Sequence, residues 1–274
     1  MIREINLGST ESVLEEPFTK GLGNLKFHHP AGTFAITPAS NILFRAIIDH
    51  ADLLHGVGFD WRSGIGCQAI LAARIPAVQL VYGLEISEAN VEIFKQNALE
   101  NGVEQKVRSI CSDSYCPFDE EEAREIAKLQ GTVDFVVSNP PSSEGDDGFS
   151  FRRMVLEGAK DFLKPGGIVL INASFQYGSE RVLSLAQPES GYRYLGVAAS
   201  TERVPFDLTR ADLLSCLRNY ALEEHRGGMR YTFFTNVEAD ERVLDARSAL
   251  RNYEEHGVSP YTKWQTHLFE WISA

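Results

Sequence analysis

The residues best suited to chemistry are Asn139, Pro140, Pro141 and Ser142, which directly follow an apolar run over 133–137. Proline has no N–H and a fixed φ, so this turn is stiff and offers acceptors rather than donors. The Asn139 side-chain oxygen and the Pro140 carbonyl can accept from a substrate N–H and so aim a nitrogen lone pair at an electrophile. The simpler interpretation is an ordinary turn, because Asn-Pro often begins one. The chemical interpretation therefore depends on a cofactor site nearby.

A second group of residues is suited to a nucleoside-type cofactor. Residues 60–67 read Asp-Trp-Arg-Ser-Gly-Ile-Gly-Cys between an apolar run and a predicted helix. Glycines there let a ligand approach the main-chain N–H groups of a helix N-terminus. Glu85 lies 19 residues after Gly66, where a carboxylate can accept hydrogen bonds from both ribose hydroxyls. Asp113 follows the next apolar run and can accept from an adenine amine. The alternative interpretation is that the glycines are turn residues and that the acidic residues are solvated helix caps.

The elements that would position these residues alternate along the chain, strand after helix. The predicted strands cover 57–60, 79–84, 107–111, 133–137 and 167–172, and the predicted helices begin near Pro38 and cover 67–74, 88–101, 120–129 and 152–163. Alternating apolar strands and helices indicate an α/β fold with a parallel sheet covered on both faces. The carboxyl ends of such strands form the usual ligand edge, so we expect all the candidate residues to meet there.

The two ends of the chain are harder to interpret. Residues 1–37 look irregular and are expected to form a lead-in or lid segment, followed by one catalytic domain over 38–274. Beyond Tyr177 the pattern predicts strands over 192–198, 229–235 and 266–271 and helices over 207–225 and 240–256. This exceeds what one sheet needs, so we expect 206–260 to be an insertion or substrate cap.

Composition excludes several classes of protein. Lys and Arg number 26 and Asp and Glu 38, so the net charge is 26 − 38 = −12, which argues against a nucleic-acid partner. No apolar run approaches the roughly 20 residues that span a bilayer, and no signal peptide is seen. The four cysteines form no Cys-x-x-Cys pair, so neither a disulfide framework nor a metal site is expected. We therefore expect a cytoplasmic protein without a membrane partner.

The combined motifs resemble the class I S-adenosyl-L-methionine (SAM)-dependent methyltransferases over about residues 30–177. The likeness is strongest to the branch that methylates nitrogen with an Asn-Pro-Pro-aromatic motif, which includes protein-glutamine, adenine and guanine methyltransferases. Residues 32–40 and 163–167 also resemble that branch. The resemblance implies a Rossmann-like, mainly parallel seven-stranded sheet with helices on both faces, and catalysis at 139–142. It implies that SAM contacts Asp60, Arg62, Ser63, Gly64, Gly66, Glu85, Ile86, Asp113, Ser114 and Asn139.

Two residues depart from the branch. Arg62 replaces the first glycine of the usual Gly-x-Gly-x-Gly, where it would either pair with the methionine carboxylate of SAM or crowd the cofactor. Ser142 replaces the usual aromatic residue and removes a platform for a planar base or amide. With the acidic charge, this predicts a small amine or amino-acid-like acceptor. The expected substrate-binding residues are Phe34, Thr37, Phe149, Phe175 and Tyr177.

Alternative functions remain open at this point. A SAM-using enzyme could break a different C–S bond, for example by cyclising SAM to azetidine-2-carboxylate with release of methylthioadenosine. A protein-glutamine or ribosomal RNA N-methyltransferase is a further alternative, and Arg62 could have turned the fold into a binding module. His28 and His29 are expected to be a surface pair rather than a catalytic base. The sequence leaves the acceptor, the base and the oligomeric state undetermined.

Overall fold

The structure is a computed structural model that describes residues 10–33, 36–143, 146–237 and 242–272. Its main sheet has the strand order β6-β5-β4-β3-β7-β8-β14-β9. The five parallel strands are β3 (Gly56–Trp61), β4 (Val78–Glu85), β5 (Val107–Asp113), β7 (Val133–Ser138) and β8 (Leu163–Asn172). Strand β14 (Gln265–Trp271) runs antiparallel between β8 and β9 (Tyr192–Ser200), and the two-residue β6 (Cys116–Pro117) is added at the far edge. The predicted Rossmann-like fold is confirmed.

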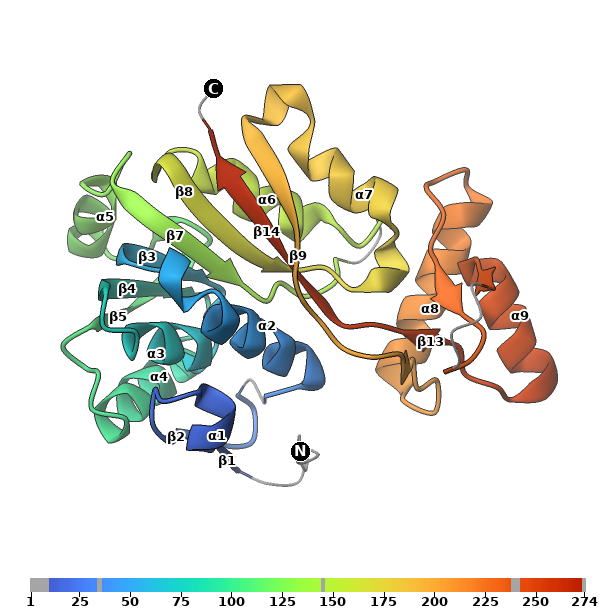
Figure 1. Cartoon of the computed structure of the whole chain (residues 1–274), viewed down its shortest axis with the longest axis horizontal. Helices are drawn as coiled ribbons and strands as arrows, with labels where there is room; N and C mark the ends of the chain where they lie inside the picture. Colours follow the sequence, from blue (N-terminus) through green and yellow to red (C-terminus); the bar gives the residue numbers. More distant parts are fainter. Residues whose placement is uncertain (1–9, 34–35, 144–145, 238–241, 273–274) are drawn as a thin grey trace.

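Helices cover both faces of this sheet (Figure 1). Because side chains alternate along a strand, Phe135 and Val137 of β7 belong to one core cluster, whereas Val136 belongs to the other. The first cluster lies under α2 (Pro38–Asp49), α3 (Cys67–Ala73) and α4 (Glu88–Glu100), and the second under α5 (Glu120–Ala127), α6 (Ser150–Ala159) and α7 (Ser179–Leu183). The 3-10 helices are η1 (Ala51–Leu53), η2 (Phe175–Tyr177), η3 (Ser184–Ala186) and η4 (Pro188–Ser190).

The N-terminal segment is more regular than expected. It forms a hairpin of β1 (Glu11–Leu14) and β2 (Leu25–His28) around the short α1 (Glu16–Thr19). The amides of Lys26 and His28 donate to the side chains of Asn101, the C-cap of α4, and Asn97 of α4, at 2.9 and 2.8 Å. The expectation of a surface histidine pair is wrong for His29, which is only 4% exposed because it lies beneath the hairpin against the Ser12 hydroxyl.

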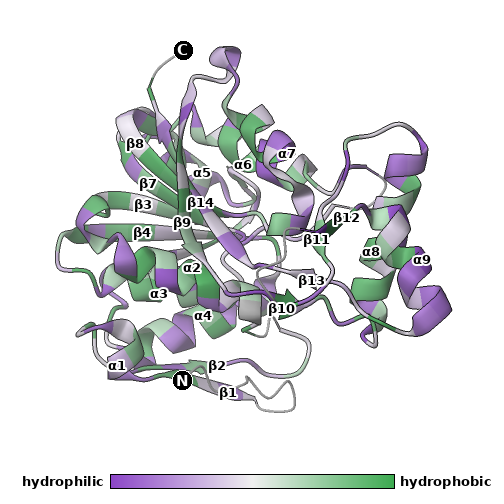
Figure 2. Cartoon of the chain, turned by 45° about the vertical axis from the view of Figure 1, so that its right-hand side comes forward, coloured by the Kyte–Doolittle hydropathy of each residue, from purple (hydrophilic) through white to green (hydrophobic). Residues whose placement is uncertain are grey.

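Residues 201–264 form a separate lobe between β9 and β14, at the right of Figure 1. A small sheet of order β10-β13-β11-β12 is flanked by two helices, as Figure 2 also shows. Its elements are β10 (Val204–Pro205), α8 (Ala211–His225), β11 (Phe233–Phe234), β12 (Val243–Leu244), α9 (Ala246–His256) and β13 (Tyr261–Thr262).

The helices of this lobe begin later than predicted, because acidic side chains act in turns and caps. Asp207 accepts from the Thr209 amide in a turn that precedes α8. Asp245 is the N-cap of α9 and accepts from the Ser248 amide at 2.7 Å. In the ranges described, no helix is long and apolar enough to cross a bilayer.

Candidate active site

The predicted cofactor residues lie at the carboxyl ends of β3, β4 and β5, and each has a structural task. Asp60, at the end of β3, is 1% exposed and accepts from the Ala69 amide at 2.9 Å. This carboxyl accepts from one of the N-terminal amides of α3. The N-cap residue of α3 is Gly66, which has no side chain that could accept such a hydrogen bond. Burial raises the pKa of Asp60 well above its usual value, and the charge of Glu85 adds to the rise.

Arg62 shows why a glycine is usual at its position. Its φ of 56° lies in the left-handed region, which a non-glycine residue adopts at a cost of about 1–2 kcal/mol. The guanidinium carbon lies 4.2 Å from the ring centroid of Phe151 and 5.2 Å from that of Trp61. The side chain is therefore held by two aromatic rings next to the β3–α3 loop.

Glu85 ties this loop to the end of β4. One carboxylate oxygen accepts from the Gly64 amide at 2.9 Å, and the other accepts from the Ser87 amide at 2.9 Å and from Asn90 at 3.2 Å. The residue is 6% exposed. A carboxylate offers about four acceptor sites, so the oxygen facing Gly64 keeps capacity for a ligand hydroxyl.

Gly66 serves packing. Its φ is 85°, and an added Cβ would lie 2.1 Å from the Phe94 ring of α4. The expectation that this glycine mainly admits a ligand is therefore incomplete, because α4 could not approach the loop if Gly66 had a side chain.

The remaining predicted cofactor residues differ in their exposure to solvent. Ile86 is 49% exposed, and Asp113, at the tip of β5, is exposed as well. Ser114 has a φ of 57° and accepts from Trp61 Nε1 at 2.8 Å. In the described part of the chain the Ser63 hydroxyl is buried without a hydrogen-bond partner. An apolar surface, an exposed acid, the Glu85 carboxylate and an unsatisfied hydroxyl fit SAM, which supplies a methyl group on an electrophilic sulfonium.

Asn139 lies at the end of β7 in a chain of polar side chains. Its oxygen accepts from the Asn172 amide at 2.8 Å, and its own amide donates to the Ser40 hydroxyl at 3.4 Å. Asn172, at the end of β8, also donates to the Ala39 carbonyl at 2.6 Å and accepts from Thr266. Sequence reasoning gave Asn172 no role in the site, and it included Ser40 only as the last residue of the segment 32–40 that resembles the branch.

The carbonyls of Pro140 and Pro141 also have donors within the protein. Arg152 of α6 donates to them at 3.2 and 3.1 Å. We expected the Asn139 and Pro140 oxygens to accept from a substrate N–H, and in the structure each already accepts one hydrogen bond from the protein. Each carbonyl oxygen has two lone pairs, so one remains for an incoming N–H.

The predicted substrate-binding residues are spread over several environments. Phe149 and Tyr177 are 0% and 3% exposed, with ring centroids 4.8 Å apart, so they form core rather than the expected pocket wall. Phe175 stacks on Phe234 of the lobe at 4.2 Å. Thr37 is the N-cap of α2, in a capping box with the same Ser40 that contacts Asn139. Phe34 lies outside the described residues.

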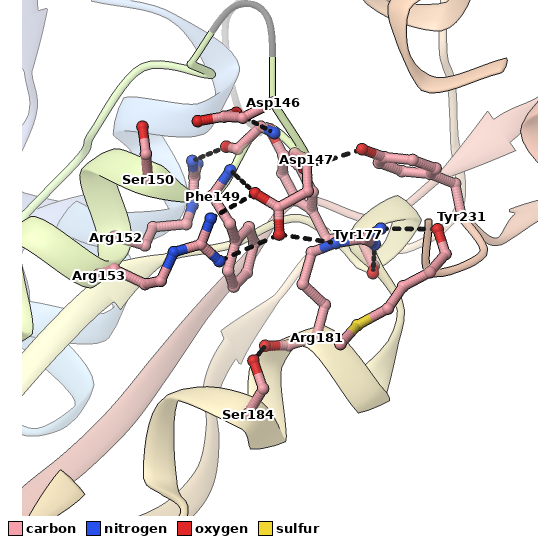
Figure 3. A network of polar contacts seen from close by, with 12 residues as sticks. Asp146, Asp147, Phe149, Ser150, Arg152, Arg153, Tyr177, Arg181, Ser184 and Tyr231 are labelled. Atoms are coloured by element: carbon pink, nitrogen blue, oxygen red, sulfur yellow. Dashed lines mark hydrogen bonds and ion pairs between the residues drawn. The ribbon is translucent and has the colours of Figure 1, made fainter. Parts of the chain in front are cut away.

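Asp147 is joined to Arg153 of α6, to Arg181 of α7 and to the C-terminal lobe (Figure 3). Asp147 forms an ion pair with Arg153 at 2.5 Å and lies 3.6 Å from the buried Arg181, while its carbonyl accepts from Tyr231 at 2.8 Å. Burial opposes ionisation of Asp147, but the hydrogen bond and charge of Arg153, the Phe149 amide and the charge of Arg181 together lower its pKa.

This sheet order, the acidic residues at the tips of β4 and β5 and the Asn-Pro-Pro turn after β7 define a class I SAM-dependent methyltransferase. The comparisons with known proteins agree. The chain belongs to the methyltransferase small domain family, whose model matches residues 24–187. A solved 16S rRNA N2 G1207 methyltransferase of T. thermophilus, in complex with AdoMet and guanosine, has the same fold with a TM-score of 0.51 and 22% identity over 70% of this chain and 49% of that one.

Two relatives of known activity are similar in sequence. The ribosomal protein uL3 glutamine methyltransferase of Neisseria meningitidis is 29% identical over 193 residues, which cover 62% of this chain and 58% of the relative. The release factor glutamine methyltransferase of Thermodesulfovibrio yellowstonii is 23% identical over 163 residues, which cover 54% and 58%. The chain thus spans less than two thirds of each relative. Because both relatives are named for a glutamine in a protein, our prediction of a small-molecule partner is wrong.

Proposed function

We propose that this SAM-dependent methyltransferase transfers a methyl group to the side-chain amide nitrogen of a glutamine in a protein partner. The observation that carries this choice is the likeness to uL3 and release factor glutamine methyltransferases over 62% and 54% of this chain. In the proposed reaction, the remaining lone pairs of the Asn139 and Pro140 oxygens accept from the glutamine N–H groups. The nitrogen then faces the ligand edge of β3 and β4.

The net charge of −12 supports a basic partner. Ribosomal proteins that bind RNA expose clustered lysines and arginines. An acidic enzyme attracts such a partner at long range and raises the rate of encounter. The same charge repels free RNA, so we favour a protein substrate over a nucleic acid.

We propose that the C-terminal lobe is the cap that receives this partner, over 201–264 rather than the predicted 206–260. The lobe leaves β9 and returns to β14 at the sheet edge where β7 and β8 end. It is fastened near the turn, because the Thr232 amide donates to the Gln176 carbonyl at 2.9 Å and the Thr262 hydroxyl donates to the Gln176 side chain at 2.6 Å. Tyr220 of α8 meets the Tyr177 hydroxyl at 3.2 Å.

At the other end of the site, we propose that the lead-in segment shields the cofactor loop. Asn97 of α4 donates both to the His28 carbonyl and to the Ile65 carbonyl, each at 3.1 Å. One side chain therefore connects the hairpin to the β3–α3 loop. This contact supports the proposed shielding of the loop by the described part of the lead-in.

The test is methyl transfer from methyl-labelled SAM by the full chain, with purified uL3 and a purified release factor as separate acceptors. We expect label on a single glutamine, found by peptide mass spectrometry, together with S-adenosylhomocysteine. The matched control is the same acceptor with that glutamine replaced by asparagine, which should take no label. Label on a lysine, no label on either protein, or methylthioadenosine as the product would each refute the proposal.

A further inference from the structure

Arg152 is a buried cation beside the reaction centre that the motifs did not reveal. It lies in the first turn of α6 and is 4% exposed. Its Nε donates to the Asn172 carbonyl at 2.8 Å, Nη1 to the Pro141 and Gly148 carbonyls at 3.1 Å each, and Nη2 to the Pro140 carbonyl at 3.2 Å. All four acceptors are neutral main-chain oxygens.

This arrangement is costly to build. Among the described residues no carboxylate lies within ion-pair distance of Arg152, and a buried charge without a counter-ion destabilises a fold. The charge is instead compensated by carbonyl dipoles and by the faces of two rings, with the guanidinium carbon 4.8 Å from the centroid of Tyr177 and 5.2 Å from that of Phe149. An apolar side chain would fill the same space at a lower cost in folding free energy, so the guanidinium has a specific task.

That task follows from the chemistry of the turn. Pro140 and Pro141 have no N–H groups, so the turn cannot be fixed through donors of their own. Their carbonyls must be held by an outside donor, and a planar guanidinium can reach several carbonyls at once. Arg152 also holds the main chain of Asn172, whose side chain orients Asn139. One side chain therefore fixes both the proline carbonyls and the residue that aims Asn139.

We propose that Arg152 is a positioning residue that holds the Asn139-Pro140-Pro141 turn in the geometry needed for methyl transfer. The proposal rests on the proposed function in one respect, because it takes this turn as the place where the acceptor binds. It does not depend on which acceptor is used. Its effect is exerted on kcat, because Glu85 and Asp113 are not among its partners.

The test compares Arg152→Lys with Arg74→Lys. Lysine keeps the charge of Arg152 but cannot span four carbonyls with one ammonium group. A misplaced reacting group costs on the order of 10²-fold in rate, so we expect kcat to fall by about that factor while SAM affinity, measured by calorimetry, changes less than about threefold. Arg74 donates to the Leu22 and Asn101 carbonyls at 2.8 and 3.3 Å, remote from the turn. Its variant should lose stability and keep kcat.

A second measurement needs no acceptor. Amide hydrogen exchange in Arg152→Lys should quicken by about tenfold at Gly148 and Ser150, whose amides donate to the Asp146 carboxylate at 2.7 Å and to the Ser143 hydroxyl at 3.1 Å, and stay unchanged at Gly64 and Gly66. Unchanged exchange at Gly148 and Ser150 would overturn the proposal. So would a fall in kcat that merely matches the loss of stability seen with Arg74→Lys. If neither uL3 nor the release factor is methylated, the exchange result still tests Arg152, so the two failures are distinguishable.

Discussion

Replacing Arg62 tests whether the left-handed backbone and the aromatic contacts of this residue have been interpreted correctly. Arg62→Gly relieves about 1–2 kcal/mol of backbone strain and adds about 0.5–1 kcal/mol of unfolded-state entropy. It also loses two cation–π contacts, at 4.2 and 5.2 Å, each worth about 0.5–1 kcal/mol. The mid-range sum is a destabilisation of about 0.8 kcal/mol, which is a fall in Tm of only a few degrees.

The matched variant is Arg62→Ala, which loses the same ring contacts but keeps the strain. Its mid-range destabilisation is about 1.5 kcal/mol, so glycine should be more stable than alanine here by about 0.5–1 kcal/mol. At an ordinary helix or strand position, an alanine variant is instead more stable than a glycine variant. Urea denaturation of both variants measures the difference, and an alanine variant more stable than the glycine variant would refute the backbone interpretation.

The same variants decide what Arg62 does for the cofactor. Because the guanidinium lies on Phe151 and Trp61, we expect Arg62→Gly to change SAM affinity by less than about threefold. Loss of a charge-assisted hydrogen bond to the methionine carboxylate would instead weaken binding by about 10- to 100-fold. A calorimetric loss of that size would show that the side chain leaves the rings and pairs with SAM.

Three further predictions concern the turn, the cofactor acid and a buried histidine. Asn139→Ala should lower kcat by about 10²-fold with SAM affinity retained, and full activity in this variant would remove Asn139 from its role. Glu85→Gln should weaken SAM binding by about 10- to 100-fold in calorimetry, because a neutral amide replaces charge-assisted acceptors, whereas unchanged affinity would place the ribose elsewhere. Burial, aided by the charge of Arg152, lowers the pKa of His267 from 6.5 to about 4. The unfolded chain therefore binds the proton first as the pH falls, and stability is lost between about pH 6.5 and 4. We expect about 2 kcal/mol less stability at pH 5 than at pH 7 in urea titrations, and a His267→Gln variant with the same pH slope as the parent chain would contradict this.

How much of the site the sequence predicts can be judged from individual residues. Glu85 and Asp113 end two apolar strands, and the alternation of strands with helices fixes where such ends meet in a parallel sheet. Asn139 was found in the same way, because its motif is four consecutive residues after a buried strand. These features are local, so their type and spacing carry the information. The C-terminal lobe was recognised only as surplus elements, because its base depends on Val204 pairing with Thr262.

What the tertiary structure alone decided is the pairing of polar groups across the site. Ser40 and Asn139 are 99 residues apart, and Asn139 and Asn172 are 33 apart. Nothing in the period of a helix or strand reports which polar side chain a distant residue will meet. The same holds for Arg152, for which the sequence predicted only a place at the start of a helix over 152–163. Once α6 packs on the sheet, the buried guanidinium takes main-chain carbonyls as its hydrogen-bond acceptors, two of them in the turn and the others at Gly148 and Asn172.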